Sequence, residues 1–348
     1  MGLQISEIVP RQEIQLHDLQ GKILAVDAFN TIYQFISTIR QPDGTPLMDS
    51  KKRITSHLSG LFYRNINLLT RGIKLVYVFD GKAPALKGVT HEARNALKEE
   101  AKRKYEEAKR AEDIEGMARY ARQTTYLTED ILIESKELLK ALGIPVVQAP
   151  SEGEAQAAYM CRTNEQIYAA ASQDYDALLF GSPRLIQNLT LARKRRLASG
   201  IFVPIQTEMI ELQQVLNTLQ LDHEQLISLG ILVGTDYNPG GIRGIGPKKA
   251  LLVVRQYKQP ALIFRHIEQQ LQQQNLRMEF NWQEIFSLFK NPEVSNNYGI
   301  KFTKPETTGL TKILCKEHDF SEERVQSALD RLEKLQEEAK QSDLKKWF

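Results

Sequence analysis

Two glutamates stand two positions apart, Glu152 and Glu154, in the segment APSEGEAQAAYM. Carboxylates paired in this way among small and apolar residues can bind a metal ion. A local interpretation is also open, because Ser151 and Glu154 fit a capping box, in which each side chain bonds to a backbone N–H group at a helix start. Carboxylates in a first helical turn also suit the helix dipole. The rest of the chain must decide between the two.

Five further acids lie at the ends of apolar runs. Asp27 ends the run in KILAVDAF, and Asp80 ends the run in KLVYVFDG. Asp174 and Asp176 lie in SQDYD after a third run, where a period of two puts both side chains on one face. Asp236 follows the apolar run in ILVGTDYNPG. A single such Asp is usually structural, but if these runs end at one edge of a sheet, all seven carboxylates share a cleft.

The chemistry of such a cleft follows from its charge. Carboxylates at close quarters repel one another unless positive charge lies between them. Oxygen ligands without His or Cys favour a hard cation, Mg²⁺ or Mn²⁺. Two such ions roughly 3.5–4 Å apart serve phosphoryl transfer, because they help to generate hydroxide and stabilise the attacking and leaving oxygens. The acids therefore predict a two-metal centre that cleaves phosphate esters.

The elements that must position these acids alternate between strands and helices. Residues 22–29 and 74–81 are unbroken apolar runs, typical of strands buried on both faces of a parallel sheet. Between them, residues 54–73 have helical spacing. The segment 131–150 predicts a helix, a stop at Gly143 and a short strand. The fold class is therefore α/β, with a mostly parallel twisted sheet flanked by helices.

The pattern changes over residues 84–128. The stretch 98–113 carries six basic and six acidic side chains, with Glu100 and Lys104 among its i,i+4 pairs. A helix with no broad apolar face should project from the core, as a solvated surface helix or as a cover over a site.

The segment GIRGIGPKKALLVV predicts a phosphate-binding hairpin. Gly244 and Gly246 let the backbone approach a phosphate, and the helix that opens at Pro247 supplies N–H donors. Lys248 and Lys249 add attraction that does not depend on base sequence. A plain helix–helix connector is the alternative, but the full G-x-G-I-G-P-K-K pattern resembles the helix-hairpin-helix motif that grips duplex backbone.

The last residues, QSDLKKWF, are polar with two terminal aromatics. One helical turn would bring the apolar members together, and an exposed aromatic pair suits docking into a groove. The spacing resembles the peptide by which replication and repair proteins bind the sliding clamp. Its positions are Gln341, Leu344, Trp347 and Phe348.

Composition sets broad limits. The 348 residues are 42% hydrophobic and 26% charged, with a net charge of +3, which is ordinary for a soluble globular protein and too mild to prove a nucleic-acid partner. Two distant cysteines favour a reducing intracellular compartment. No apolar run approaches the roughly 20 residues of a membrane span.

Taken together, VDAFNTIYQF, VYVFDGK, APSEGEAQAAYM, ASQDYDALLFG, LVGTDYNPGGIRGIGPKKA and the clamp-type tail resemble the XPG-type 5′ nucleases, in their archaeal flap endonuclease form. The resemblance implies a PIN-like nuclease core with a helical arch, which cuts 5′ flaps at junctions with duplex DNA. It also implies two Mg²⁺ ions per subunit, with Mn²⁺ as a substitute, and a K⁺ ion at the hairpin.

The resemblance also assigns roles to residues. It implies that all seven acids bind metal, and that Lys87 and Arg94 steady the scissile phosphate from the base of the arch. The implied DNA contacts are Tyr33, Arg40, Arg64, Glu152, Gly234, Asp236, Gly244, Gly246, Lys248 and Lys249.

The expected organisation follows the same resemblance. It comprises an N-terminal nuclease region at 1–98, an arch insertion at 99–128 that begins near 84, an internal nuclease region at 129–258 with its hairpin at 241–250, a C-terminal helical region at 259–335 and a flexible tail at 336–348.

The function expected is a structure-specific 5′ flap endonuclease of DNA replication, where it matures Okazaki fragments, and of repair, with 5′–3′ exonuclease activity. We expect a monomer that docks on a clamp ring in the archaeal cytoplasm or nucleoid, without membrane contact. Two rivals are a non-catalytic, clamp-recruited scaffold that binds junctions, and a small-molecule phosphohydrolase, since strand-end aspartates also serve there.

Overall fold

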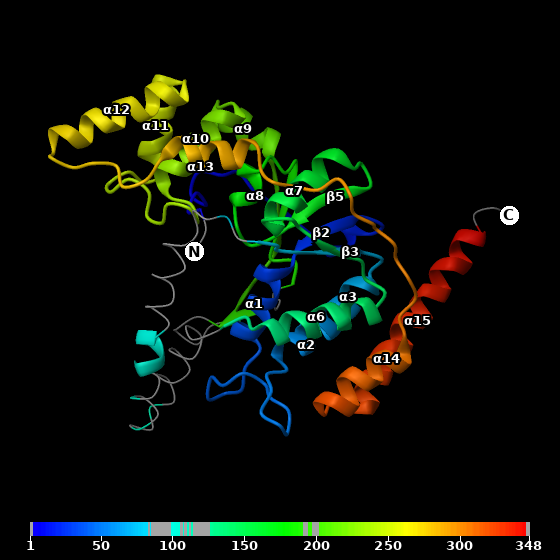
Figure 1. The fold of residues 1–348 in the computed structure, drawn as a ribbon. Coiled ribbons are helices and arrows are strands. Elements are labelled where there is room, and N and C mark those ends of the chain that lie inside the picture. The colour runs from blue at the N-terminus through cyan, green and yellow to red at the C-terminus, as the bar shows by residue number, and fades with distance from the viewer. Residues whose placement is uncertain are drawn as a thin grey trace.

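A seven-stranded sheet forms the centre of the molecule (Figure 1). The computed structural model describes residues 3–82, 84, 99–104, 107, 110, 113, 126–190, 194–196 and 202–345. The strand order is β1-β9-β6-β5-β2-β3-β4. The bounds are β1 Gln12–Ile14, β2 Ile23–Asp27, β3 Lys74–Phe79, β4 Val146–Gln148, β5 Ile167–Ala171, β6 Arg184–Gln187 and β9 Thr207–Glu211.

The central strands of this sheet are parallel. β2 pairs in parallel with both β3 and β5, β3 with β4, and β5 with β6, while β9 pairs antiparallel with β1 and β6. The apolar runs at 22–29 and 74–81 contain the strands β2 and β3, as predicted, and these two strands are neighbours in the sheet. Every residue of β3 after Lys74 is buried, because helices cover both faces.

Alternation along the strands feeds two cores, one on each face. Ala25, Val76 and Val78 pack toward one core, while Val26 and Tyr77 pack toward the other. This is the period of two expected of strands.

The helices divide between these faces. On the first lie α7 Gly153–Thr163, α8 Asp176–Leu179, α9 Leu212–Leu219, α10 His223–Val233, α11 Pro247–Tyr257, α12 Pro260–Gln273 and α13 Trp282–Lys290. On the second lie α1 Ala28–Thr38, α2 Ser56–Ser59, η2 Gly60–Arg64, α3 Asn65–Leu69, α6 Glu129–Ala141, α14 Thr307–Thr311, η5 Lys312–Glu317 and α15 Glu322–Lys345. A short 3₁₀ helix, η1, spans Leu16–Leu19. The α/β fold class is confirmed.

The C-terminal region at 259–335 does not pack as one unit. α12 and α13 pack on α10 and α11, whereas α14 and α15 pack against α6 and α3 on the other face. Figure 1 shows the orange connection between α13 and α14 running along the molecule. It is held by backbone bonds from Thr303 N to the Gly143 carbonyl at 3.2 Å and from Glu306 N to the Ala141 carbonyl at 2.8 Å.

Other expectations for surface segments meet mixed outcomes. The basic run RKRR at 193–196 has the composition of a surface turn, but Lys194–Arg196 is strand β7, paired with β8 at Phe202–Pro204. The helical stretch 99–104 lies away from the sheet (Figure 1), and Lys104 Nζ is 2.6 Å from Glu100 Oε1 as expected. Most of the arch expected at 84–128 lies outside the described residues.

No helix among the described residues is both long and apolar enough to cross a membrane. α15 continues to Lys345, so the tail expected at 336–348 is helical over most of its length. An N–H of its first turn, that of Arg324, donates to Ser321 Oγ at 3.4 Å, as expected of an N-cap serine.

Candidate metal centre

Two aspartates lie where the neighbouring parallel strands β2 and β3 end. Asp27 is the last residue of β2 and Asp80 follows β3 directly. The Asp27 side chain accepts a hydrogen bond from Asn30 N at 3.1 Å and so caps α1. Asp80 Oδ1 accepts a hydrogen bond at 2.6 Å from the backbone N–H of Gly153, the first residue of α7. Parallel strands thus bring both acids to one edge of the sheet.

The paired glutamates enter the same edge at the start of α7. Glu152 is the N-cap residue of α7, and Glu154 lies in the first turn. The capping box predicted as one interpretation is wrong, because the helix begins one residue later than it requires. Ser151 Oγ instead donates to the Lys82 carbonyl at 3.3 Å, and Glu154 Oε1 accepts from Ser172 Oγ at 2.5 Å.

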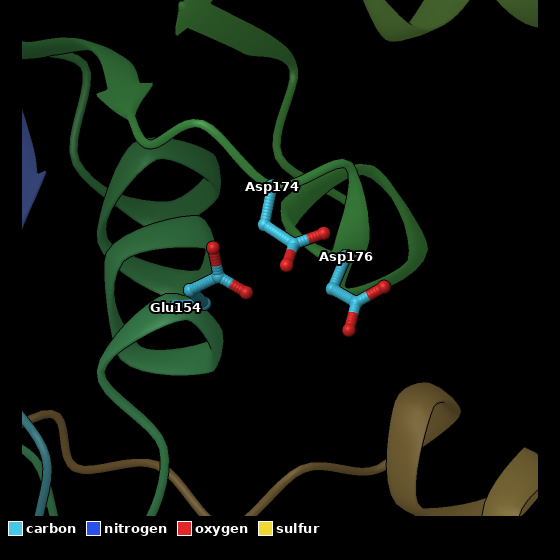
Figure 2. A group of neighbouring side chains, drawn as sticks. All are labelled: Glu154, Asp174 and Asp176. Carbon is cyan, nitrogen blue, oxygen red and sulfur yellow. The ribbon is translucent and has the colours of Figure 1, made fainter. Parts of the chain in front are cut away.

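Asp174 and Asp176 follow β5, and their side chains lie beside that of Glu154 (Figure 2). Each of the three side chains offers an oxygen, and these oxygens all lie within 4.8 Å of one another. The predicted period of two is wrong as an explanation, because β5 ends at Ala171. Asp174 lies in the connection, and Asp176 is the first residue of α8. A turn, not a pleat, therefore brings the two side chains together.

The electrostatics of this cluster are those of crowded negative charge. Burial, followed by the Asp174, Asp27 and Asp176 carboxylates, raises the pKa of Glu154 well above its ordinary value. Burial, followed by the Asp236 carboxylate, raises the pKa of Asp174 to about 6. The charges of Asp27 and Asp236 therefore act on the acids of Figure 2, and Asp27 shares the Ser172 hydroxyl with Glu154.

Asp236 comes from a helix end, not from a strand. The apolar run that precedes it forms α10, which ends at Val233, and Asp236 lies in the turn that follows. Asn238 holds this turn by accepting from Thr235 Oγ1 at 2.7 Å and donating to the Ile231 carbonyl at 2.7 Å. The next residue, Tyr237, is 6% exposed, and burial, followed by the Glu152 carboxylate, raises the pKa of its phenol.

All seven predicted acids therefore gather at one edge of the sheet, and their chemistry fits a hard divalent cation. The donors are carboxylate oxygens, which Mg²⁺ and Mn²⁺ prefer. Asp174 Oδ1 is buried and has no hydrogen-bond partner among the described residues. A buried carboxylate oxygen without a donor is costly unless a cation contacts it.

The hairpin lies next to this edge, at the end of α10 and the start of α11. Gly246 is the N-cap of α11 and Pro247 its first residue, as predicted. Gly244 has φ +81°, and a Cβ added there would meet no atom within 4 Å, so the backbone is open to a ligand. Lys248 and Lys249 are exposed at the helix start, and Lys248 Nζ is 3.5 Å from Glu7 Oε2.

Gly234 shows why this connection needs a glycine. Its φ is +115°, and a Cβ there would lie 2.6 Å from the backbone N of Gly241. Gly234→Ala should therefore destabilise the protein by about 1–3 kcal/mol, through strain and a clash with backbone. Chemical denaturation measures this cost, with Gly299→Ala as the control, because a Cβ at Gly299 meets nothing within 4 Å. Equal stability of the two variants would contradict the described turn.

The predicted DNA-contacting residues of the N-terminal half differ in their exposure and in their contacts with the rest of the protein. Tyr33 is on α1 and is 38% exposed, open to stacking. Arg40 is half-buried and donates through Nη1 to the Gly44 carbonyl at 2.7 Å. Arg64 donates to the Thr190 carbonyl and lies 5.4 Å from the Phe35 ring centre. Arg64 therefore also holds local structure.

Some predicted residues cannot be placed. Lys87 and Arg94 lie outside the described residues, as do Trp347 and Phe348. Gln341 and Leu344 fall within α15. Figure 1 shows the end of α15 far from α11, on the other side of the molecule.

Sequence reasoning missed two residues that contact the acids. Ser172 bonds to Asp27 and Glu154, and Tyr237 lies against Glu152. Both stand next to or near predicted acids, in SQDYD and TDYNPG. A polar residue between a buried strand and an acidic turn was the available signal for Ser172.

Comparison with known proteins defines the class to which this fold and acidic edge belong. Residues 2–101 match the model of the XPG N-terminal domain, and residues 143–236 match the model of the XPG I-region. With the full-length relatives described next, these matches show that the chain belongs to the flap endonuclease family of XPG-type nucleases.

Individual relatives lie within the archaeal branch. The chain is 53% identical over 349 residues to Flap endonuclease 1 of Pyrococcus furiosus, covering 100% of this chain and 99% of that protein. It is 51% identical to Flap endonuclease 1 of Thermococcus onnurineus, again covering 100% and 99%. Among solved structures, flap endonuclease-1 from Methanococcus jannaschii matches with a TM-score of 0.75 and 40% identity, covering 96% of this chain and 98% of that one. The catalytic core of Rad2 in complex with DNA shares the fold, with a TM-score of 0.68 and 23% identity over 94% and 97%.

Proposed function

We propose that this protein is a structure-specific 5′ flap endonuclease of DNA replication and repair, which cuts a phosphodiester near the junction of single strand and duplex. One observation carries the proposal: acids from β2, β3, α7, the β5–α8 connection and the turn after α10 gather at a single sheet edge. The full-length likeness to archaeal flap endonucleases supports it. Okazaki fragment maturation and 5′–3′ exonuclease activity belong to the same proposal.

The proposed roles follow from the geometry of the carboxylates. Glu154, Asp174 and Asp176 would hold one divalent cation, since their oxygens are the most closely grouped. The remaining acids, Asp27, Asp80, Glu152 and Asp236, would complete the site for Mg²⁺, with Mn²⁺ as a substitute. Divalent cations bound here would supply a water of lowered pKa and offset the charge of the phosphate.

The protein would hold DNA by its backbone. The N-terminus of α11, with Gly244, Gly246, Lys248 and Lys249, offers N–H groups, a favourable dipole and positive charge to duplex phosphates. We assign a K⁺ ion to the same hairpin. Such contacts read the shape of DNA and not its sequence.

Other contacts complete the proposed path of the substrate. Tyr33 would stack on a base at the junction, and Arg40, Arg64 and Gly234 would lie along the DNA. The 5′ single strand would pass beneath the segment 84–128, where Lys87 and Arg94 would steady the scissile phosphate.

The proposed domain organisation joins regions 1–98 and 129–258 into one nuclease core, with 99–128 as the arch. The sheet supports this, because it contains strands from both regions, with β2 of the first paired to β5 of the second and β3 of the first paired to β4 of the second. The protein would act as a monomer, since a single chain supplies all the proposed metal ligands. Its proposed location is the cytoplasm or nucleoid.

The proposed sliding-clamp contact depends on the spacing of Gln341, Leu344, Trp347 and Phe348. Because α15 carries the tail away from α11 (Figure 1), a clamp bound there would leave the hairpin accessible. Deletion of residues 341–348 should abolish retention on an immobilised sliding clamp and leave flap cutting in free solution unchanged. Retention of the shortened chain would reject the clamp peptide.

The proposed activity is tested with a labelled 5′-flap duplex. The purified chain should cut it near the junction with Mg²⁺ and not with EDTA, and should leave single strands largely uncut. A small phosphate ester serves as the control substrate and should remain intact. Flap binding without cutting at any salt or divalent-metal concentration would reject the nuclease and favour a junction-binding scaffold.

A further inference from the structure

Ser172 is a buried residue at the centre of the acidic edge. It follows β5 and is 5% exposed. Its Oγ lies 2.5 Å from Glu154 Oε1 and 3.3 Å from Asp27 Oδ2. The backbone N–H of Asp174 donates to the same oxygen at 3.2 Å. One hydroxyl therefore joins β2, α7 and the connection that carries Asp174.

The hydrogen-bonding capacity of the hydroxyl explains this arrangement. A serine hydroxyl donates one hydrogen and accepts through two lone pairs. Asp174 N–H occupies an acceptor position, so the single proton serves the two carboxylates. The shorter bond goes to Glu154, and Asp27 is the second acceptor within reach.

The hydroxyl bridges two carboxylates that come from different elements of the fold. Asp27 belongs to a strand, and Glu154 belongs to a helix on the face above it. Their like charges repel each other, and a hydrogen-bond donor between them offsets part of that repulsion. A hydroxyl held by the Asp174 backbone supplies that donor and ties its position to the third acid.

We infer that Ser172 is a positioning residue of the metal centre, which fixes the spacing of Asp27, Glu154 and Asp174 for a divalent cation. The inference rests on the proposed function, because it assumes that these acids bind metal. Groups that orient metal ligands in this way typically change metal affinity about 10–100-fold when they are removed.

Manganese binding tests the inference without relying on activity. Free Mn²⁺ is measured by its electron paramagnetic resonance signal as metal is titrated into the purified chain. Ser172→Ala should bind Mn²⁺ about 10–100-fold more weakly than the wild type, whereas Ser172→Thr, which keeps the hydroxyl, should bind more tightly than the alanine variant. Ser135→Ala is the matched control, because Ser135 is also buried and its Oγ donates to the Ile131 carbonyl within α6, away from the acids.

The outcomes separate the inference from the proposed function. Wild-type affinity in Ser172→Ala overturns the positioning role and leaves the nuclease proposal intact. A wild-type chain that binds Mn²⁺ and cuts no flap rejects the nuclease, and the Ser172 comparison still holds. A wild type that binds no Mn²⁺ overturns both. If Ser172→Ala does not fold, Ser172→Cys, with similar volume and a weaker donor, should show the same loss of affinity, and wild-type affinity in that variant overturns the inference.

Discussion

Replacing Asp176 by alanine should slow flap cutting by more than about 100-fold, because removal of a direct metal ligand should exceed the 10–100-fold cost of removing a group that only orients one. Asp176 is 4% exposed and opens α8, so no neighbouring side chain can take its position without moving the helix start. Its carboxylate faces Glu154 and Asp174 within 4.8 Å. The loss should appear in the rate of the bound complex, since Asp176 is not among the proposed DNA contacts.

Single-turnover cutting of a labelled flap, with DNA affinity measured separately in Ca²⁺, distinguishes these effects. Asp130→Ala is the control, because Asp130 is an exposed acid in the first turn of α6. Unchanged cutting by Asp176→Ala would remove Asp176 from the mechanism. Loss of DNA binding with an unchanged single-turnover rate would move its role from chemistry to substrate binding.

Asp174→Asn should stabilise the metal-free protein while it impairs cutting. Burial, and then Asp236, raise the pKa of Asp174 from 3.8 to about 6. Ionising this group in the folded state therefore costs free energy, and the rise in pKa to about 6 corresponds to about 3 kcal/mol at neutral pH. The neutral amide avoids that cost. Denaturation in EDTA at pH 7.5 should show the variant as the more stable, with Asp130→Asn unchanged.

The free energy of unfolding should depend on pH in a way that reflects the same cost of ionising Asp174. The unfolded chain loses the Asp174 proton near pH 3.8 and the folded chain near pH 6, so the folded state binds more protons between these values. The contribution of Asp174 to the free energy of unfolding should fall as pH rises through this window. The difference in stability between Asp174→Asn and the wild type should therefore grow from pH 4 to pH 6. Saturating Mg²⁺ should reverse the order at neutral pH, and an Asn variant that is less stable in EDTA would contradict the electrostatic account.

The sequence predicts the strands and the acids well, because burial and charge leave plain patterns. The unbroken apolar runs that end in Asp27 and Asp80 predict buried strands, and β2 and β3 have this form. The adjacency of β2, β3 and β5 could be expected from the parallel α/β pattern. The glycine positions of the hairpin were also readable, since Gly244 and Pro247 constrain the backbone locally.

Features that depend on tertiary contacts were less predictable. Ser151 and Glu154 satisfy a local capping pattern, yet Ser172 and Lys82, both distant in sequence, take their hydrogen bonds. The apolar run before Asp236 has the composition of a strand but forms the helix α10. This helix packs on α11 and α13, and these contacts bury its apolar residues. Hydrogen bonds between buried polar side chains from distant segments leave no periodic pattern in the sequence.

The division of the C-terminal helices between two faces was equally hidden. Each of α12, α13, α14 and α15 has an apolar stripe, and nothing in the stripe says which face of the sheet it covers. The extended connection decides, by backbone bonds to Ala141 and Gly143. Gln156 of α7 adds to this by bonding to both backbone groups of Ser295, at 2.8 Å each.

A crystal of the protein soaked in Mn²⁺ tests the central claim most directly, through the anomalous signal of the metal. We expect two anomalous peaks at the sheet edge, the first among Glu154, Asp174 and Asp176, and both coordinated by carboxylate oxygens of the seven acids. A soaked crystal with no peak at this edge, or with manganese only at scattered surface carboxylates, would contradict the shared metal centre and the nuclease that depends on it.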